Sequence, residues 1–388
     1  MSGAAKVPHI YIVAGEESGD RLGAALIGAL KRATGGQVRF SGIGGAQMAA
    51  EGVPSLFPLG ELAIIGFAAI VGSLPKILAR IREAADAVIA AKPDLVVIID
   101  SPEFTHRVAR RVRAKAPHIP IVDYVCPSVW AWRPGRARAM RAYVDEVLAL
   151  LPFEPQTMQK LGGPRTVFVG HPLSERAVRL RPNAEEAARR SSEPPVVLAL
   201  PGSRSGEVKR MAPVFGQALG LVAASHGPLD VVVPAVPRLA ETVRAAVAAW
   251  PVPARVITDA AEKDAAFRTA RAALTKSGTS TLELAVAGIP MVAAYQVPLV
   301  EEAVARLLIK VESVILANLV VGENVVPELL QRACTPRSLA GALLPLLGDT
   351  PERRRQTAAF ARLDAIMEIG KAVPSERAAA EVLACLAR

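Results

Sequence analysis

The stretch VVLALPGSRSGEVKR, residues 196 to 210, decides the fold, because a buried strand stops there at a cationic turn and a helix follows. Residues 196–200 are continuously apolar, as expected of a parallel strand covered on both faces. A Pro-Gly pair then breaks the strand, and a helix is expected from about Ser205. The N–H groups that begin a helix attract anions, and Arg204 adds a guanidinium suited to phosphate oxygens. The stretch predicts a phosphate site, although α/β proteins also place glycine at such turns without a ligand.

The composition is that of an ordered chain with anionic partners. Its 388 residues are enough for two domains, and its hydrophobic fraction of 51% excludes a disordered protein. The 46 Lys and Arg residues outnumber the 36 Asp and Glu residues, and the net charge of +10 favours phosphates, anionic lipids or nucleic acid. The three cysteines form no CxxC pair, so neither a disulfide framework nor a zinc site is indicated and a cytoplasmic protein is expected.

Strands and helices alternate along both halves of the chain, which predicts two doubly wound parallel sheets, each covered by helices on both faces. The expected strands are residues 10–14, 38–42, 94–100, 119–125, 146–150, 196–200, 229–233, 254–257, 272–275 and 290–294. A polar stretch between residues 173 and 195 suits a linker. We therefore expect a Rossmann-like domain over residues 1–175, another over 190–350, and C-terminal helices over 351–388 that pack on the first domain or on a partner subunit. Ligands should bind where the carboxyl ends of both sheets face a shared cleft.

Carboxylates follow two buried strands of the first half. Glu16 comes directly after the first strand and Asp100 directly after the run LVVII, so both should stand at one sheet edge. There Asp100 is the better candidate for a general base and Glu16 the next, because a carboxylate beside a dry sheet can take a proton from an alcohol. The alternatives are a solvated loop for Glu16 and a helix cap for Asp100, and Ser18 or Asp20 could likewise cap the first helix.

Residues 124–143 interleave two tryptophans with several arginines. Such a basic and aromatic cluster can bind RNA, but no RNP-like or helix-turn-helix pattern accompanies it. A small anionic sugar or a lipid phosphate would be bound equally well. We expect no nucleic acid partner.

A second phosphate turn is predicted at Ser277-Gly278-Thr279-Ser280, after the strand that ends near residue 275. Glu283 lies one turn into the next helix, where a carboxylate can accept both hydroxyls of a ribose. Ser280 and Glu283 also have the spacing of a capping box, and the two interpretations, a nucleotide site and a helix cap, can hold together.

The most apolar segment is LAIIGFAAIVGSL, residues 62–74. It is shorter than the roughly 20 residues that span a bilayer. It is either a core helix or a helix embedded in a membrane surface.

Eight motifs in order resemble the lipid-A-disaccharide synthase family. They are GEESGD (15–20), IDSPEF (99–104), PSVWAWRPGRA (127–137), LPFE (151–154), VGHPL (169–173), LPGSR (200–204), SGTSTLEL (277–284) and NLVVGENVVPELLQ (318–331). The resemblance implies a GT-B-type glycosyltransferase fold of two Rossmann-like domains. It also implies an inverting reaction between UDP-2,3-diacylglucosamine and 2,3-diacylglucosamine 1-phosphate that gives a β-1,6 disaccharide and UDP.

The resemblance gives roles to particular residues. Asp100 or Glu16 would be the base. The expected UDP-binding residues are Gly202, Ser203, Arg204, Ser277, Gly278, Thr279, Ser280, Glu283 and Asn318. On the acceptor or lipid side we expect Ser18, Gly19, Trp132, Arg133, Arg136, His171, Ile65 and Phe67, with a hinge role equally open for His171. No role is carried over to Glu103, Thr105, Glu323 and Asn324, which depart from the family pattern.

The family's chemistry also sets expectations about partners. No DxD motif is present, so neither a metal nor another cofactor is expected. Because the substrates of the family are diacylated, we expect the segment 62–74 to bind the cytoplasmic face of the inner membrane. A homodimer is possible. The rivals are another UDP-sugar enzyme, such as a UDP-N-acetylglucosamine epimerase, and a nonenzymatic lipid- or RNA-binding module with the same fold.

Overall fold

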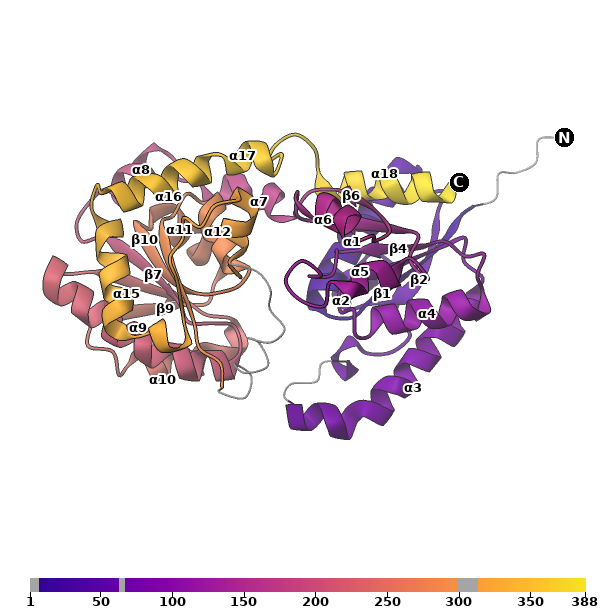
Figure 1. The fold of residues 1–388 in the computed structure, drawn as a ribbon, viewed down its shortest axis with the longest axis horizontal. Coiled ribbons are helices and arrows are strands. Elements are labelled where there is room, and N and C mark those ends of the chain that lie inside the picture. The colour runs from indigo at the N-terminus through magenta and orange to yellow at the C-terminus, as the bar shows by residue number, and fades with distance from the viewer. Residues whose placement is uncertain (1–6, 63–66, 299–312) are drawn as a thin grey trace. The chain divides into compact units, whose positions relative to one another are not determined.

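The computed structural model describes residues 7–62, 67–298 and 313–388. The chain divides into two units (Figure 1), one formed by residues 1–174 with 370–388 and the other by residues 175–369. Each unit is built on one parallel sheet of six strands, because its strands are apolar runs joined by helices.

The first unit contains the sheet β2-β1-β3-β4-β5-β6, in which Ile12 of β1 lies opposite Gly42 of β2 and Val97 of β3. Its elements are β1 (His9–Ala14), α1 (Glu17–Ala33), β2 (Arg39–Ile43), α2 (Ala46–Ala50), η1 (Leu59–Glu61), α3 (Phe67–Ala91), β3 (Leu95–Ile99), α4 (Thr105–Lys115), β4 (Ile121–Tyr124), α5 (Gly135–Met140), β5 (Glu146–Ala149), α6 (Glu154–Lys160), β6 (Arg165–Phe168) and α18 (Pro374–Leu386).

Both faces of the first sheet are buried. Alternate residues of β1 enter two different cores: Tyr11 and Val13 pack on the face covered by α3 and α4, whereas Ile10 and Ile12 pack on the face covered by α1. The last helix of the chain, α18, packs against α1 and adds Val382 to this second core (Figure 1). The C-terminal 19 residues thus complete the first unit, while α16 and α17 belong to the second.

The second unit contains the sheet β12-β11-β10-β7-β8-β9. Its elements are α7 (Leu173–Leu180), which begins two residues before the boundary, α8 (Ala184–Arg190), β7 (Val196–Leu200), α9 (Ser205–His226), β8 (Asp230–Pro234), η2 (Pro237–Leu239), α10 (Ala240–Val247), β9 (Ala254–Ile257), α11 (Ala260–Thr269), β10 (Ala272–Lys276), α12 (Ser280–Val286), β11 (Met291–Tyr295), α14 (Leu316–Val321), β12 (Glu328–Leu330), η3 (Gln331–Ala333), α15 (Pro336–Leu343), η4 (Leu344–Leu347), α16 (Pro351–Ala361) and α17 (Leu363–Ile366).

Each sheet has a switch point, where the chain order reverses between two neighbouring strands. It lies between β1 and β3 in the first unit and between β7 and β10 in the second. Ligands of open α/β sheets bind at the carboxyl ends of the strands beside such a point. Residues that were predicted from the sequence as site candidates therefore lie at both switch points.

The expected strands are confirmed within one or two residues at most ends, and α9 begins at Ser205 as predicted. Two edge strands, β6 and β12, were not predicted. Both are short and only half buried, so neither carries the apolar run that identifies the inner strands.

Candidate functional site

The carboxylate of Asp100 lies at the first switch point, directly after β3, and is held from two sides. Ser18 Oγ donates to its Oδ2 at 2.9 Å, and the Ser101 N–H donates to its Oδ1 at 2.8 Å. Asp100 and Ser101 both have positive φ, 55° and 45°, which is costly for residues with a Cβ. The two strand-end motifs of the first unit thus meet, and a strained backbone fixes the direction of one carboxylate.

The other residues predicted beside this strand end differ in role. Glu16 is exposed and occupies the N-cap of α1. A Cβ on Gly19 would lie 3.2 Å from the carbonyl oxygen of Ile99, so the glycine lets α1 approach β3 closely. Asp20 does not cap α1, because its carboxylate accepts three N–H groups at the start of α2 at 2.7 to 3.0 Å. Substrate contacts of Glu16 and Gly19 stay predictions.

A cavity of about 190 Å³ opens beside Asp100. Three predicted residues, Asp100, Trp132 and Arg136, line it together. Two further lining residues, His106 and Asp123, were not predicted. Asp123 lies inside the apolar strand β4 and His106 inside α4, and no sequence spacing signals that the fold would bring them together.

Asp123 and His106 form a buried pair at this cavity. Asp123 Oδ2 lies 3.0 Å from His106 Nε2, although the ring N–H is not aligned for a regular hydrogen bond. His106 Nδ1 lies 3.1 Å from the hydroxyl of Tyr143, which accepts from Arg110 at 3.3 Å. Burial raises the pKa of Asp123, and the histidine only partly offsets this effect. The wall of the cavity that Asp123 forms is therefore dry.

An arginine cluster borders the same cavity. Glu103 sits at its centre and binds Arg107 at 3.5 Å, Arg133 at 3.2 Å and Arg136 in a short contact. The guanidiniums of Arg133 and Arg136 lie 4.4 and 5.7 Å from the ring centre of Trp132. Although partial burial opposes ionisation, the arginines hold the pKa of Glu103 below its ordinary value. Three cations around one carboxylate leave an excess of positive charge that suits an anionic ligand.

The turn after β7 forms the first half of the second switch point. Gly202 has φ 133°, and a Cβ there would lie 2.5 Å from Cβ of Glu207. Glu207 is buried, and its Oε2 accepts the N–H groups of Ser203 at 3.0 Å and Arg204 at 3.3 Å. The side chain of Arg204 is 73% exposed. A buried carboxylate thus shapes the turn and leaves the guanidinium accessible, a role of Glu207 that was not predicted from the sequence.

The turn after β10 forms the second half, because β10 pairs with β7 in parallel. Thr279, not Ser280, is the N-cap of α12 and its side chain caps nothing, so the predicted capping box is wrong. A capping box would require the carboxylate of Glu283 to accept a backbone N–H at the start of the helix. Glu283 instead binds Arg176 and Lys263, both at 3.1 Å. Ribose binding by Glu283 stays a prediction.

Asn318 has a complete set of partners in its own loop. Its side-chain amide donates to Ser313 Oγ and to the carbonyl of Val326, and its oxygen accepts from the N–H groups of Val325 and Val326. The residue is buried. These contacts give Asn318 a loop-shaping role, and a direct contact with UDP stays a prediction.

His171 caps the start of α7, because its Nδ1 accepts the N–H of Leu173 at 3.0 Å and its carbonyl accepts the Oγ of Ser174 at 2.8 Å. Both a substrate contact and a hinge role stay predictions for His171. Of the two predicted lipid-side residues in the apolar segment, Ile65 lies outside the described residues. Phe67 is the first residue of α3, and its side chain also lies outside what the structure describes. Across the described residues, no helix is long and apolar enough to cross a bilayer.

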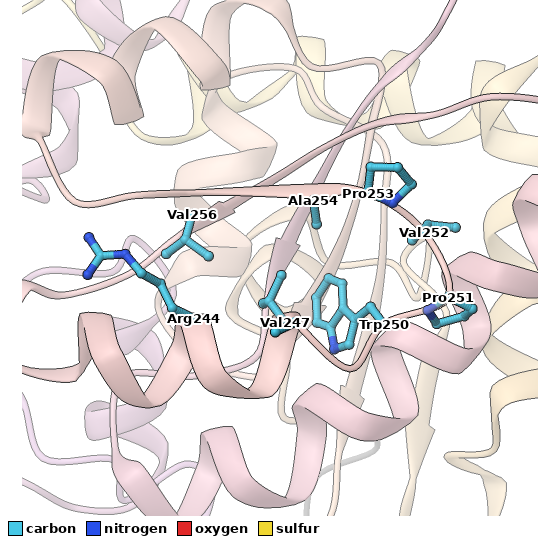
Figure 2. Close-up of a pocket in the computed structure, with 9 residues that line it drawn as sticks. Arg244, Val247, Trp250, Pro251, Val252, Pro253, Ala254 and Val256 are labelled. Carbon is cyan, nitrogen blue, oxygen red and sulfur yellow. The ribbon is translucent and has the colours of Figure 1, made fainter.

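A second cavity of about 600 Å³ lies in the second unit (Figure 2). Val247, Trp250 and Val252 line it with Arg244, beside the loop that leads into the edge strand β9. This loop precedes its strand, so the cavity lies at the amino ends of the strands, whereas the second switch point lies at their carboxyl ends. The cavity is larger than the one at Asp100 but lacks carboxylates among its lining residues, and we do not assign it to catalysis.

Comparison with known proteins identifies what the chain is similar to. The family model for lipid-A-disaccharide synthetase matches residues 10–382. The lipid-A-disaccharide synthase of Nitrobacter hamburgensis is 60% identical over 375 residues, covering 97% of this chain and 95% of the relative. That of Bradyrhizobium diazoefficiens is 58% identical over 386 residues, covering 100% of this chain and 98% of the relative.

Solved structures give the fold. Acinetobacter baumannii MurG superposes with a TM-score of 0.60 at 16% identity, covering 97% of this chain and 99% of that one. The calicheamicin glycosyltransferase CalG4 superposes with a TM-score of 0.61 at 18% identity, covering 98% of both chains. At these identities the likeness concerns the fold alone, which is of the GT-B type.

Proposed function

The chain belongs to the lipid-A-disaccharide synthetase family and carries lipid-A-disaccharide synthase activity in lipid A biosynthesis, and from that premise we propose how its two switch points divide the reaction. The proposed donor is UDP-2,3-diacylglucosamine and the proposed acceptor is 2,3-diacylglucosamine 1-phosphate. The acceptor's 6-hydroxyl oxygen attacks the anomeric carbon of the donor sugar. The bond from that carbon to UDP breaks, and the configuration inverts.

Asp100 takes the proton of the attacking hydroxyl. Its support is geometric: a carboxylate held by Ser18 and the Ser101 N–H lines a cavity at a sheet switch point. Glu16 is the second candidate, because it follows the neighbouring strand β1. Once the hydroxyl has lost its proton to Asp100, the carboxylic acid returns that proton to solvent.

The acceptor's phosphate pairs with the arginine cluster of Arg107, Arg133 and Arg136. The cluster borders the Asp100 cavity through Arg136, which lines it with Trp132. Guanidiniums bind phosphate oxygens in a bidentate manner, so such a cluster orients a sugar phosphate with its hydroxyl side toward the base.

The UDP group is bound by the second unit. Arg204 and the turns after β7 and β10 neutralise its diphosphate, and Glu283 binds the ribose after exchanging contacts with Arg176 or Lys263.

The observation that carries the proposal is the cavity at the first switch point, which is lined by both the held carboxylate of Asp100 and a guanidinium of the arginine cluster, that of Arg136. The test incubates the full-length protein with both proposed substrates and measures UDP release and disaccharide formation. We expect both products in equal amounts, and no UDP when UDP-N-acetylglucosamine replaces the donor. UDP release without the acceptor, or epimerisation of UDP-N-acetylglucosamine, would favour the rival UDP-sugar enzyme.

We also propose that the segment 62–74 attaches the protein to the cytoplasmic face of the inner membrane. The support is its composition, the net charge of +10 and the diacylated substrates. In flotation with anionic vesicles, changing both Ile65 and Phe67 to Ser should reduce the amount of protein in the lipid fraction. Equal flotation of the two proteins would refute the attachment.

A further inference from the structure

Lys276 joins the two turns of the second switch point. It is the last residue of β10, and its Nζ lies 3.1 Å from Oε1 of Glu207, the buried carboxylate that shapes the turn after β7. The ammonium also lies 4.6 Å from the ring centre of Tyr295, at the end of β11. One cation at the end of β10 thus contacts residues from two other elements, α9 and β11, at the edge where UDP is proposed to bind.

Glu207 holds this lysine in place. Burial favours the neutral form of the carboxyl, yet Lys276 and the backbone N–H of Ser203 hold the pKa of Glu207 below its ordinary value. Oε2 accepts from the turn after β7, and Oε1 contacts both Lys276 and, at 3.4 Å, Arg204, so one carboxylate binds groups from both halves of the switch point. A change at Glu207 should therefore disturb both halves.

The lysine has donors for a ligand as well. An ammonium carries three N–H groups, and one bond to Glu207 uses one of them. The side chain of Lys276 is 18% exposed, so it is partly buried and still open to solvent. In such a partly desolvated position a cation acts on a phosphate more strongly than at an open surface.

We infer that Lys276 is a further residue of the UDP site, which donates to the diphosphate and stabilises it as it leaves, and that Glu207 is its positioning residue. This inference rests on the proposed function. Two cations then stabilise the negative charge that develops on the leaving UDP: Arg204 from the turn after β7 and Lys276 from the end of β10. This arrangement also explains why a buried carboxylate occupies a site for an anion, because Glu207 fixes the lysine.

The test measures the affinity of the full-length protein for UDP and for uridine by calorimetry. Lys276→Gln should weaken UDP binding about 10- to 100-fold, the loss expected for one charge-assisted hydrogen bond, and leave uridine binding unchanged. Lys276→Arg should keep most of the UDP affinity. Glu207→Gln should weaken UDP binding and make it less sensitive to Lys276→Gln in the double variant, because the lysine is then no longer positioned.

The matched control is Lys209→Gln, which removes the same charge from the exposed side of α9. It should bind UDP as the unchanged protein does. Equal UDP affinity of Lys276→Gln and the unchanged protein would overturn the inference, and so would an equal loss of UDP and uridine binding. If the unchanged protein bound no UDP at all, the proposed function itself would fail, which is a distinguishable result.

Discussion

The two switch points of this chain have the same topology but carry different side chains. Beside β3, the carboxylate of Asp100 lies with the buried Asp123 at a small cavity, which Arg136 of the arginine cluster also lines. Beside β7, the buried carboxylate of Glu207 has a lysine at 3.1 Å and an arginine at 3.4 Å. The same sheet edge can therefore serve proton transfer or anion binding, and the side chains placed there decide which.

Ionisation follows the same division. Burial raises the pKa of Asp123, and it raises the pKa of Glu154, one strand further along, to about 7. In the second unit burial opposes ionisation of Glu207, yet Lys276, the Ser203 N–H and Arg204 together hold its pKa below its ordinary value. A site that accepts protons needs the first environment, and a site that binds a diphosphate needs the second.

The largest expected effect comes from Asp100→Asn, which removes the proposed base without changing its size. We expect kcat to fall about 10²- to 10⁴-fold, as is usual for the loss of a general base. The rate of UDP release at saturating substrates measures it. Asp86→Asn, on the exposed side of α3, is the matched control and should keep full activity. Full activity of Asp100→Asn would give the role of base to Glu16 or another group.

Next in size is a pH effect on stability from Glu154. Its carboxyl accepts from Trp130 Nε1 and the Leu151 N–H, but burial dominates and raises its pKa from 4.5 to about 7. Between these values the folded protein keeps a proton that the unfolded chain has lost, so this group's contribution to stability falls as pH rises from about 4.5 to 7. The loss amounts to about 3 kcal/mol.

Urea unfolding of the protein and of Glu154→Gln at several pH values measures this effect. For Glu154→Gln, the free energy of unfolding should not decline between pH 5 and 7. A constant destabilisation by the amide would shift the whole curve and leave this result unchanged. Parallel curves for the two proteins would show that Glu154 is ionised in the folded state and that this part of the first unit is less dry than its burial implies.

A smaller effect is expected from Arg204→Gln at the cationic switch point. The guanidinium is mostly exposed, so its loss should leave folding intact and weaken UDP binding about tenfold or somewhat more. Arg244→Gln is the control, because Arg244 lines the cavity of Figure 2 at the opposite end of the sheet. If both variants bound UDP equally well, the diphosphate would lie elsewhere.

The remaining prediction concerns the backbone geometry of the turn and its effect on stability. Gly202→Ala should destabilise the second unit by about 1 to 3 kcal/mol, because φ is 133° and the new Cβ would meet Glu207 at 2.5 Å. At Gly227, φ is 109° and a Cβ would meet nothing within 4 Å, so Gly227→Ala measures the conformational cost alone. The difference between the two unfolding midpoints isolates the contact with Glu207. Equal midpoints would mean that the turn shifts freely.

The inner strands and the switch-point motifs were predictable because parallel strands covered on both faces are apolar runs with polar residues at their ends. Asp100, Ser18 and Arg204 were found in this way. Edge strands lack the pattern, which is why β6 and β12 were missed.

The partners of these residues were not predictable. His106 and Asp123 lie on different elements and meet only in the folded unit, and Glu207 reaches Lys276 across a gap of 69 residues. The expected capping box at Ser280 failed because Glu283 pairs with Arg176 and Lys263, which tertiary packing brings near. Sequence spacing predicts local contacts, whereas these depend on strand order.

The most direct test of the division between proton transfer and diphosphate binding is the UDP affinity of Asp100→Asn, measured by calorimetry on the preparation whose turnover is lost. We expect a Kd within about twofold of the unchanged protein, because the diphosphate is bound at the cationic switch point of the other unit. A loss of tenfold or more, as expected for Arg204→Gln, would contradict the division and make Asp100 part of the UDP site.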